Sequence, residues 1–290
     1  MNTTIHLRRS LALAVAGSLA ALALAGCSGA STAATVAADC EPAHEGLTTY
    51  TAGTLTVGVP ENLPYTQTEG ADAAGLEIDV LKKIAEAECL SLAFVPITYA
   101  NGIPMISEQK KADLISGGWY VTEARAEQVG FTSPTFYDTM GIISKDGATT
   151  VTDLESIGAV GSVAGFSWEA DMSAVLGDEL KTYPGTVETK QDLVSGRIQA
   201  ALDGYAVATV AYAGTDFIVE PAEADDRVAI TTTMPIIAFP IAKENTELSD
   251  AISELIDAYR EDGTLEELLA DYDLPADLLV PADAAATSIR

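Results

Sequence analysis

Histidine and cysteine are scarce in this sequence of 290 residues, which contains only two histidines and three cysteines. Their positions give no Cys/His spacing of a metal site and no pairing of a histidine with a nucleophile. The chain also lacks the Gly-Lys-Ser/Thr phosphate loop of nucleotide-binding proteins. We therefore expect no metal, no cofactor and no catalytic machinery, which favours a binding protein over an enzyme.

Basic residues are scarce as well. The chain has 15 lysines and arginines against 43 aspartates and glutamates, a formal net charge of -28. Such a surface repels phosphate backbones and anionic lipid, so we exclude nucleic acid as a partner and electrostatic adhesion to a membrane. Aromatic residues make up only 6%, but 48% of the residues are apolar, and the length suggests about two domains.

No apolar run is long enough to be a confident membrane span. The longest, residues 11–25, is rich in alanine and follows a pair of arginines, as in an export signal. It ends in Leu-Ala-Gly-Cys27, which resembles a lipoprotein signal. We therefore expect that residues 1–26 are removed and that Cys27 carries a lipid anchor. An ordinary secretory signal with a chance cysteine is the alternative, and the Sec and twin-arginine export routes both stay open.

The remaining cysteines, Cys40 and Cys89, form an even pair, which in an exported protein indicates a disulfide. The bond would tie the segment ahead of the first strand to the end of the first helix. Two separate buried thiols are the alternative. Residues 27–45 are largely small and polar without a periodic apolar face, and we interpret them as a flexible tether.

Strands and helices alternate along the rest of the chain. A strand at 54–59, a helix at 75–89 and an apolar strand at 112–115 favour an open, largely parallel sheet, whose ligands bind outside the carboxyl ends of the strands. A second α/β unit follows, and the chain crosses between the two units near residues 142 and 238. The predicted organisation is lobe 1 at 46–142 and 238–275, lobe 2 at 143–237, and a loosely packed tail at 276–290.

The most informative stretch runs from Gly117 to Pro134, directly after the apolar strand. The glycines at 117 and 118 remove side chains and would let a ligand approach the backbone. Thr122 can cap a short helical turn from which Arg125 projects. A guanidinium beside backbone N–H groups is suited to holding a carboxylate, although a surface ion pair on a short helix is the alternative reading of Arg125.

This stretch also carries a family resemblance. Gly118-Trp-Tyr-Val-Thr-Glu-Ala-Arg125, followed by Phe131-Thr-Ser-Pro134, resembles the extracellular amino-acid-binding proteins of ABC importers, in their polar-amino-acid (family 3) branch. The resemblance implies an α/β fold of two lobes, each a mainly parallel sheet flanked by helices, with a hinge of two crossing segments. Further landmarks of that family occur in the same order: Leu55-Thr-Val-Gly58, Gly75-Leu-Glu-Ile-Asp79, Val160-Gly-Ser-Val-Ala-Gly165, Gly196-Arg-Ile-Gln-Ala200 and Asp262-Gly-Thr-Leu265.

The resemblance implies roles for particular residues. Arg125 would hold the ligand's α-carboxylate, and Gly117 and Gly118 would contact the ligand through their backbone. Ser167, which can also cap the following helix, would reach the carboxylate from the second lobe. Asp203 lies one residue before the position of the aspartate that takes the α-ammonium, and it could instead cap the helix that starts near Tyr205.

Other candidates would shape the site. Tyr65 matches an aromatic wall over the ligand's side chain, and Trp119, Tyr120 and Phe166 are further wall candidates. Tyr120 stands where the family has a small hydroxyl residue, which prevents transfer of a particular ligand. Glu61 would select a cationic side chain, or is simply a solvated loop carboxylate.

These features predict a monomeric, lipid-anchored receptor on the outer face of the cell membrane. It would close on a small amino acid or related carboxylate and deliver it to the permease of an ABC importer. An enzyme on the same scaffold, a dehydratase using Glu61 or Asp203 as acid or base, is one alternative. A sensor without a transport role is the other.

Overall fold

The computed structural model describes residues 36–37, 39–282 and 289, all within the unit Thr32–Arg290. Cys27, the export signal and the first part of the predicted tether lie outside these residues. None of the helices that the structure describes combines the length and the apolar character needed to cross a bilayer.

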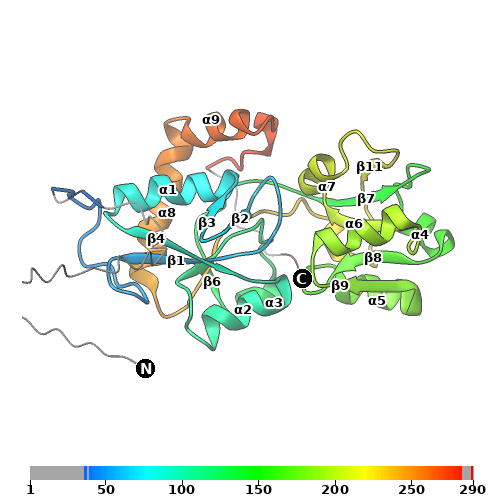
Figure 1. Cartoon of the computed structure of the whole chain (residues 1–290), viewed down its shortest axis with the longest axis horizontal. Coiled ribbons are helices and arrows are strands. Elements are labelled where there is room, and N and C mark those ends of the chain that lie inside the picture. The colour runs from blue at the N-terminus through cyan, green and yellow to red at the C-terminus, as the bar shows by residue number, and fades with distance from the viewer. Residues whose placement is uncertain (1–35, 38, 283–288, 290) are drawn as a thin grey trace, which may run out of the picture. The chain divides into compact units, whose positions relative to one another are not determined.

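The first sheet contains five strands in the order β4-β1-β5-β12-β6 (Figure 1). The strand β1 pairs in parallel with β4 and β5, whereas β12 lies antiparallel between β5 and β6. Both faces of β1 are buried, as in parallel strands that helices cover on each side. The strands are β1 Thr54–Val59, β4 Ser91–Pro96, β5 Leu114–Ile115, β6 Gly130–Phe131 and β12 Pro240–Ile241.

The second sheet also has five strands, in the order β11-β7-β10-β8-β9. The strand β8 pairs in parallel with β9 and β10, and β7 lies antiparallel between β10 and β11. The strands are β7 Met140–Ser144, β8 Val160–Val163, β9 Leu180–Tyr183, β10 Ala200–Gly204 and β11 Ile218–Pro221.

One strand in each sheet therefore runs against the other four: β12 in the first and β7 in the second. Each follows a segment that brings the chain over from the other sheet. The two segments in which the chain crosses between the sheets are residues 135–137 and 236–237. They pair with each other, because Ile237 N donates to Phe136 O at 2.8 Å. The chain joins the second sheet at Met140 and returns to the first at Pro240, each two residues from the expected crossing positions of 142 and 238.

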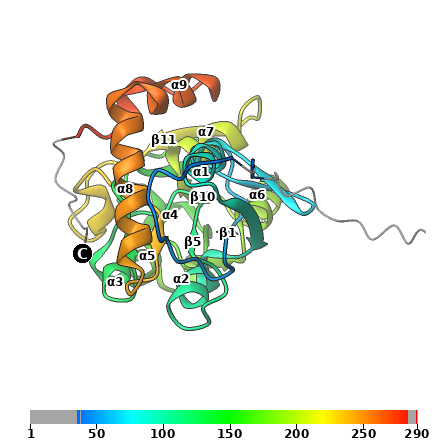
Figure 2. The same ribbon diagram turned by 90° about the vertical axis from the view of Figure 1, so that its left-hand side faces the viewer.

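Helices pack on both sheets. Figure 2 shows α9 lying across the end of α8, and α9 also contacts α1. A small hairpin, β2 Gln67–Glu69 and β3 Asp72–Ala74, precedes α1. The helices of the first sheet are α1 Leu76–Ala87, α2 Tyr99–Ser107, α3 Glu123–Ala126, α8 Thr246–Glu261 and α9 Thr264–Asp271. Those of the second are α4 Val151–Ile157, α5 Glu169–Leu176, α6 Thr186–Ser195 and α7 Tyr205–Ala211, and short 3-10 turns lie at Gly177–Glu179, Ala229–Thr231 and Ala276–Leu278.

The described part of the carboxyl-terminal tail is attached to the crossing strand, so the expectation of loose packing from 276 onward is wrong for these residues. Tyr137 N donates to Leu278 O at 2.7 Å, and Val280 N donates to Thr135 O at 3.3 Å. The side chain of Val280 is 1% exposed and packs with Val121, Ile236 and Ala238. Ile289, 5% exposed, accepts a hydrogen bond from Glu123 N at 2.7 Å.

We predict that Val280→Ala lowers the free energy of unfolding by roughly 2 kcal/mol, because it leaves a cavity among buried apolar groups. Val187 is 51% exposed, so the matched change Val187→Ala should cost less than about 0.5 kcal/mol. Urea denaturation measures both values. Equal effects of the two substitutions would mean that the tail contributes nothing to the fold.

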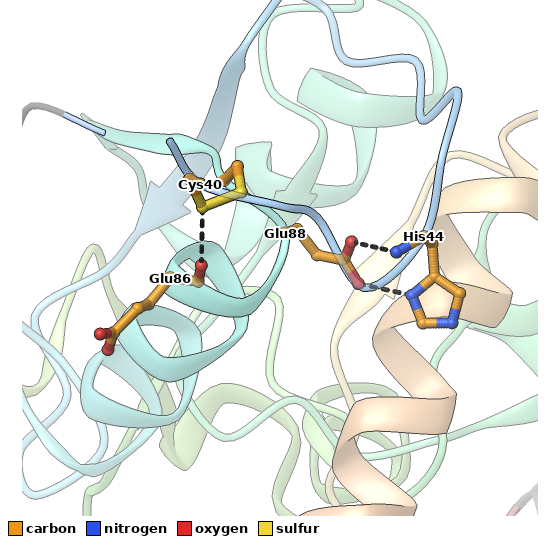
Figure 3. Close-up of a disulfide and its surroundings, with 5 residues drawn as sticks. Cys40, His44, Glu86 and Glu88 are labelled. Atoms are coloured by element: carbon orange, nitrogen blue, oxygen red, sulfur yellow. Dashed lines mark hydrogen bonds and ion pairs between the residues drawn. A yellow bond between two sulfur atoms is a disulfide. The ribbon is translucent and has the colours of Figure 1, made fainter. Parts of the chain in front are cut away.

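A disulfide joins Cys40 to Cys89, as predicted, with the two Cα atoms 5.8 Å apart (Figure 3). Next to it, His44 binds the end of α1. Its backbone N donates to Glu88 Oε2 at 3.0 Å, and its Nδ1 lies 2.6 Å from Glu88 Oε1. The other ring nitrogen lies 3.1 Å from Oε2 of Glu254 in α8. The hydrogen bonds to Glu88 and Glu254 raise the pKa of His44.

We predict that the stabilising contribution of His44 is greater at pH 6 than at pH 9. A raised pKa in the folded state means that this contribution is fully present below the ordinary histidine pKa of about 6.5 and is lost as the pH rises through the raised value. The difference in unfolding free energy between wild type and His44→Gln, measured in urea, should therefore shrink between these two pH values. Glu254→Gln removes only the exposed partner and should show the same trend at smaller size; a pH-independent difference would contradict the ion-pair account.

Candidate functional site

A small pocket lies where strands of both sheets end. The loops that follow β1, β5 and β8 contribute, as do the last two residues of β10, which places the pocket at the carboxyl ends of parallel strands, where such sheets bind ligands. Its interior measures about 20 Å³, room for about one water molecule. The first-sheet side is lined by Asn62, Tyr99, Gly118, Tyr120 and Arg125. The other side is lined by Phe166, Ser167, Trp168, Asp203, Gly204 and Val207, and Asp138 comes from the crossing between the sheets.

Arg125 lies in this pocket and is only 9% exposed. Its helix α3 begins as predicted, with the Thr122 side chain accepting a hydrogen bond from Arg125 N at 3.2 Å. The guanidinium donates to Tyr120 O at 2.8 Å and, across to the second sheet's loop, to Gly165 O at 3.1 Å. It also stacks on the ring of Trp119, 4.7 Å from the ring centroid. The interpretation of Arg125 as a surface ion pair is therefore wrong.

Burial in this environment lowers the pKa of Arg125 to about 10, so the guanidinium remains charged at neutral pH. Its hydrogen-bond partners are neutral carbonyl groups, and no carboxylate among the described residues pairs with it. A buried cation without a counter-ion is costly by several kcal/mol. The pocket is consequently suited to an anionic group.

The two glycines after β5 have a different purpose from the one expected. Gly117 and Gly118 both donate their N–H groups to Glu77 Oε2, at 2.6 and 3.1 Å, and Glu77 is buried in α1. The carbonyl of Gly117 accepts hydrogen bonds from Asn62 and Tyr99. These N–H groups are therefore occupied by the protein itself, and only Gly118 lines the pocket.

Close packing explains why glycine is needed at both positions. Gly117 has φ +120°, and a Cβ there would lie 2.4 Å from a ring carbon of Pro60. Gly118 has φ +72°, and a Cβ there would lie 2.8 Å from the ring of Tyr65. Tyr65 is itself 1% exposed and supports the loop from behind instead of lining the pocket.

We predict that Gly118→Ala is more destabilising than Gly196→Ala. The two glycines have nearly the same φ, +72° and +76°, so the backbone strain of about 1 kcal/mol is shared. Only the Gly118 substitution also clashes with a buried ring, which should add about 1–3 kcal/mol. Thermal melts of both variants test this. Equal melting temperatures would show that the contact with Tyr65 does not constrain the loop.

Aromatic side chains form the walls. Tyr99 packs edge to face against Phe166, with ring centroids 4.7 Å apart, and Phe166 packs in the same way against Trp168 at 4.9 Å. Tyr120 lines the pocket and donates its hydroxyl to Thr139 O at 3.1 Å. Trp119, 1% exposed, supports Arg125 from outside the pocket lining.

Ser167 lines the pocket as predicted but does not cap α5. The residue at the helix cap is Trp168, and it forms no side-chain cap. Glu61 does not line the pocket: its exposed carboxylate accepts a hydrogen bond from Thr68 N at 3.0 Å, as a loop carboxylate would.

Two buried carboxylates, Asp138 and Asp203, also line the pocket. Asp203, 4% exposed, accepts a hydrogen bond from Gly204 N on Oδ1 at 2.8 Å, and burial raises its pKa to about 8. Asp138, 3% exposed, accepts on Oδ1 from Thr139 N at 2.9 Å and Ala206 N at 3.2 Å. Burial raises its pKa to about 6. The interpretation of Asp203 as the cap of α7 is therefore wrong, since the first two N–H groups of that helix, of Tyr205 and Ala206, donate to Thr139 O and to Asp138 Oδ1.

Sequence reasoning missed Tyr99 and Asp138 as pocket residues, and it assigned no role to Asn62 in the turn after the first strand. Asn62 follows β1, so its place at the carboxyl end of a central strand was an available signal. Tyr99 begins α2 after β4 in the same way. Asp138 gives no such signal, because it lies between two strands whose crossing only the folded chain reveals.

The fold and the pocket define a class of protein. Two mixed β-sheets, each covered by helices, meet at a small pocket, as in the periplasmic-binding-protein fold. Residues 55–274 match the model of the bacterial extracellular solute-binding proteins, family 3. The chain belongs to this family, and amino-acid-binding proteins are among its relatives.

Three similar proteins illustrate the relationship. The histidine-binding periplasmic protein of Salmonella typhimurium is 26% identical over 69% of this chain and 79% of that protein. The structure of an ancestral arginine-binding protein bound to arginine is 26% identical and has a TM-score of 0.66, covering 76% of this chain and 98% of the other. The ancestral amino acid-binding protein AncCDT-1, described as a precursor of cyclohexadienyl dehydratase, is 25% identical with a TM-score of 0.66, covering 76% and 95%.

Proposed function

We propose that this protein is an exported receptor that binds a small amino acid, or a related carboxylate, between its two sheets and delivers it to the permease of an ABC importer. Membership of an extracellular solute-binding family supports the coarse function. Lipid on Cys27 would hold the receptor at the outer face of the cell membrane, where it would meet the permease as a monomer.

Arg125 is the observation that carries the proposal. Its guanidinium is buried, charged and without a carboxylate partner among the described residues. It reaches both a first-sheet carbonyl and the loop after β8, so an anion bound here would contact both lobes. A ligand carboxylate would replace weak carbonyl contacts with charge-assisted, bidentate hydrogen bonds. Closure of the lobes would then be favoured by the ligand's contacts with both sides.

The α-ammonium of the ligand would bind on the opposite wall. Asp203 lines that wall, and only one described hydrogen bond reaches its carboxylate, on Oδ1. Ser167 and the aromatic rings would enclose the rest of the molecule. Known ligands of relatives, such as histidine for the Salmonella protein, support an amino acid without fixing which one.

We predict that Arg125→Ala abolishes binding while it leaves the unliganded protein folded. A panel of amino acids and organic acids, tested by thermal shift, should contain a ligand that stabilises the wild type by about 2.7 kcal/mol at 100 times its Kd. The variant should show no shift with that ligand, and its own melting temperature should change little because an unpaired buried charge is removed.

Arg197→Ala serves as the control, since that side chain is 65% exposed and paired with Asp192. It should leave the ligand shift unchanged. An unimpaired shift in Arg125→Ala would refute the assignment.

An enzyme on this scaffold is the second candidate, favoured by the pKa of about 8 for Asp203, which makes that carboxyl a possible general acid at neutral pH. Incubation of the protein with ligands from the panel, followed by mass spectrometry, distinguishes the two functions. Unchanged ligand supports a receptor, and a dehydrated product would establish the enzyme.

A further inference from the structure

The loop that follows β8, on the second-sheet side of the pocket, lies directly against the first turn of α2, on the first-sheet side. Gly165 makes this contact: a Cβ added to it would lie 2.7 Å from Tyr99 C and from Ala100 N, and 2.9 Å from Ala100 Cα. Carbon atoms in contact are normally about 3.5–4.0 Å apart. Therefore no side chain fits at position 165 while the two sides of the pocket remain this close.

The first turn of α2 is held firmly in place. Asn101 Oδ1 accepts a hydrogen bond from Thr98 N at 2.9 Å, which fixes the start of the helix. The side chain of Tyr99 is 6% exposed, its hydroxyl donates to Gly117 O, and its ring packs on that of Trp119 with the centroids 4.8 Å apart. Displacement of this turn would disrupt these contacts, so it is a rigid support for the loop that lies on it.

The loop after β8 is constrained as well. Gly165 has φ +89°, a left-handed conformation that favours glycine. Its N–H group donates to Oε2 of Glu169, in the first turn of α5, at 2.6 Å. The preceding residue, Ala164, donates its N–H group to Tyr183 O at 2.8 Å. Since both surfaces are held by their own sides, a side chain at position 165 would push the two sides of the pocket apart.

Two interactions across the pocket depend on this close approach. Arg125 Nη2 donates to Gly165 O at 3.1 Å, and the ring of Phe166 packs edge to face against that of Tyr99 with the centroids 4.7 Å apart. A hydrogen bond is lost beyond about 3.5 Å, so a separation of several tenths of an ångström is enough to break the first of them. A molecule bound to both sides would lose affinity for the same reason.

We propose that Gly165 is a positioning residue for ligand binding. Its missing side chain lets the loop after β8 rest on α2, and this contact sets how closely the two lobes approach the ligand. The inference rests on the proposed function, in which one small molecule contacts both sides of the pocket. Gly165 is not among the residues that line the pocket, so it acts through its size and through the carbonyl that accepts from Arg125.

Gly165→Ala and Gly263→Ala are a matched pair of variants that tests the proposal. The two glycines have φ +89° and +88°, so both substitutions introduce the same kind of backbone strain. A Cβ at Gly263 would have no atom within 4 Å, so only the change at Gly165 forces two surfaces apart. Both variants should remain folded in a thermal melt, because separation of the lobes relieves the clash in Gly165→Ala.

The two tryptophans of the chain report on the separation. Trp119 lies on the first-sheet side and Trp168 on the second-sheet side, and they are 1% and 2% exposed. Separation of the two sides would admit water to the rings. Acrylamide should therefore quench the fluorescence of Gly165→Ala more steeply than that of the wild type, with emission shifted to longer wavelength. Gly263→Ala should behave as the wild type does.

Calorimetry then measures the effect on binding. The probe is the member of a panel of the standard L-amino acids that raises the melting temperature of the wild type most. Gly165→Ala should bind this amino acid at least about tenfold more weakly, as loss of a hydrogen bond to a charged group implies. Gly263→Ala should retain the wild-type affinity.

Each contrary result has a distinct meaning. Equal quenching of the three proteins would overturn the role of Gly165, because the added side chain would then be accommodated within the loop. Unfolding of Gly165→Ala alone, or unchanged affinity despite increased quenching, would overturn it as well, and the receptor function would stand in all three cases. A wild type that binds no member of the panel would instead overturn the receptor function, on which the proposal rests.

Discussion

The buried guanidinium of Arg125 is the constraint on which the rest of the site depends. A charged group 9% exposed must be held and compensated. The cap at Thr122 fixes its helix, the ring of Trp119 supports it, and carbonyls from both lobes accept its hydrogen bonds. These partners compensate only partly, because none carries a full negative charge. In the proposed receptor, a ligand carboxylate would complete the arrangement, and binding and the approach of the two lobes would depend on the same group.

The crossing segments, residues 135–137 and 236–237, connect the segment of Arg125 to both sheets. Val121 N, just before the helix of Arg125, donates to Ile236 O at 3.0 Å, and the tail adds hydrogen bonds from the outer side of strand 135–137. The segment that carries Arg125, the two crossings and the tail are thus joined by hydrogen bonds in one continuous network. A rotation of one sheet relative to the other must act on these same hydrogen bonds. The antiparallel strands β7 and β12 are the first strands after each crossing, so in the proposed receptor any such rotation would reach the sheets through them.

The sequence was informative wherever local rules apply. The apolar strand before Gly117, the cap at Thr122 and the buried arginine follow from spacing and side-chain chemistry, and family motifs predicted the two-sheet fold. It was misleading where a residue's role depends on distant partners. Gly117 and Gly118 suggested an open approach to ligand, but the folded chain uses their N–H groups for Glu77 and their missing side chains to admit Pro60 and Tyr65.

The tail and Asp138 show the same limit. Composition suggested a loose carboxyl terminus, yet Val280 is 1% exposed because two segments far away in sequence, at 121 and at 236–238, provide its apolar partners. Asp138 stands in a stretch with no periodic pattern, and its importance arises from the meeting of the crossing segment with the start of α7. Such convergence is a property of the topology, and no window of sequence around the residue contains it.

Burial alone does not separate the carboxylates of this protein; their place in or outside the pocket lining does. Glu77 is 1% exposed, yet it receives three hydrogen bonds from the chain and does not line the pocket, so its charge stabilises the glycine loop. Asp203 and Asp138 are nearly as buried, but the backbone hydrogen bonds that reach them go to Oδ1 and both residues line the pocket. Glu77 therefore holds the glycine loop through Oε2, whereas Asp203, Asp138 and Arg125 line the pocket, where a ligand could reach them.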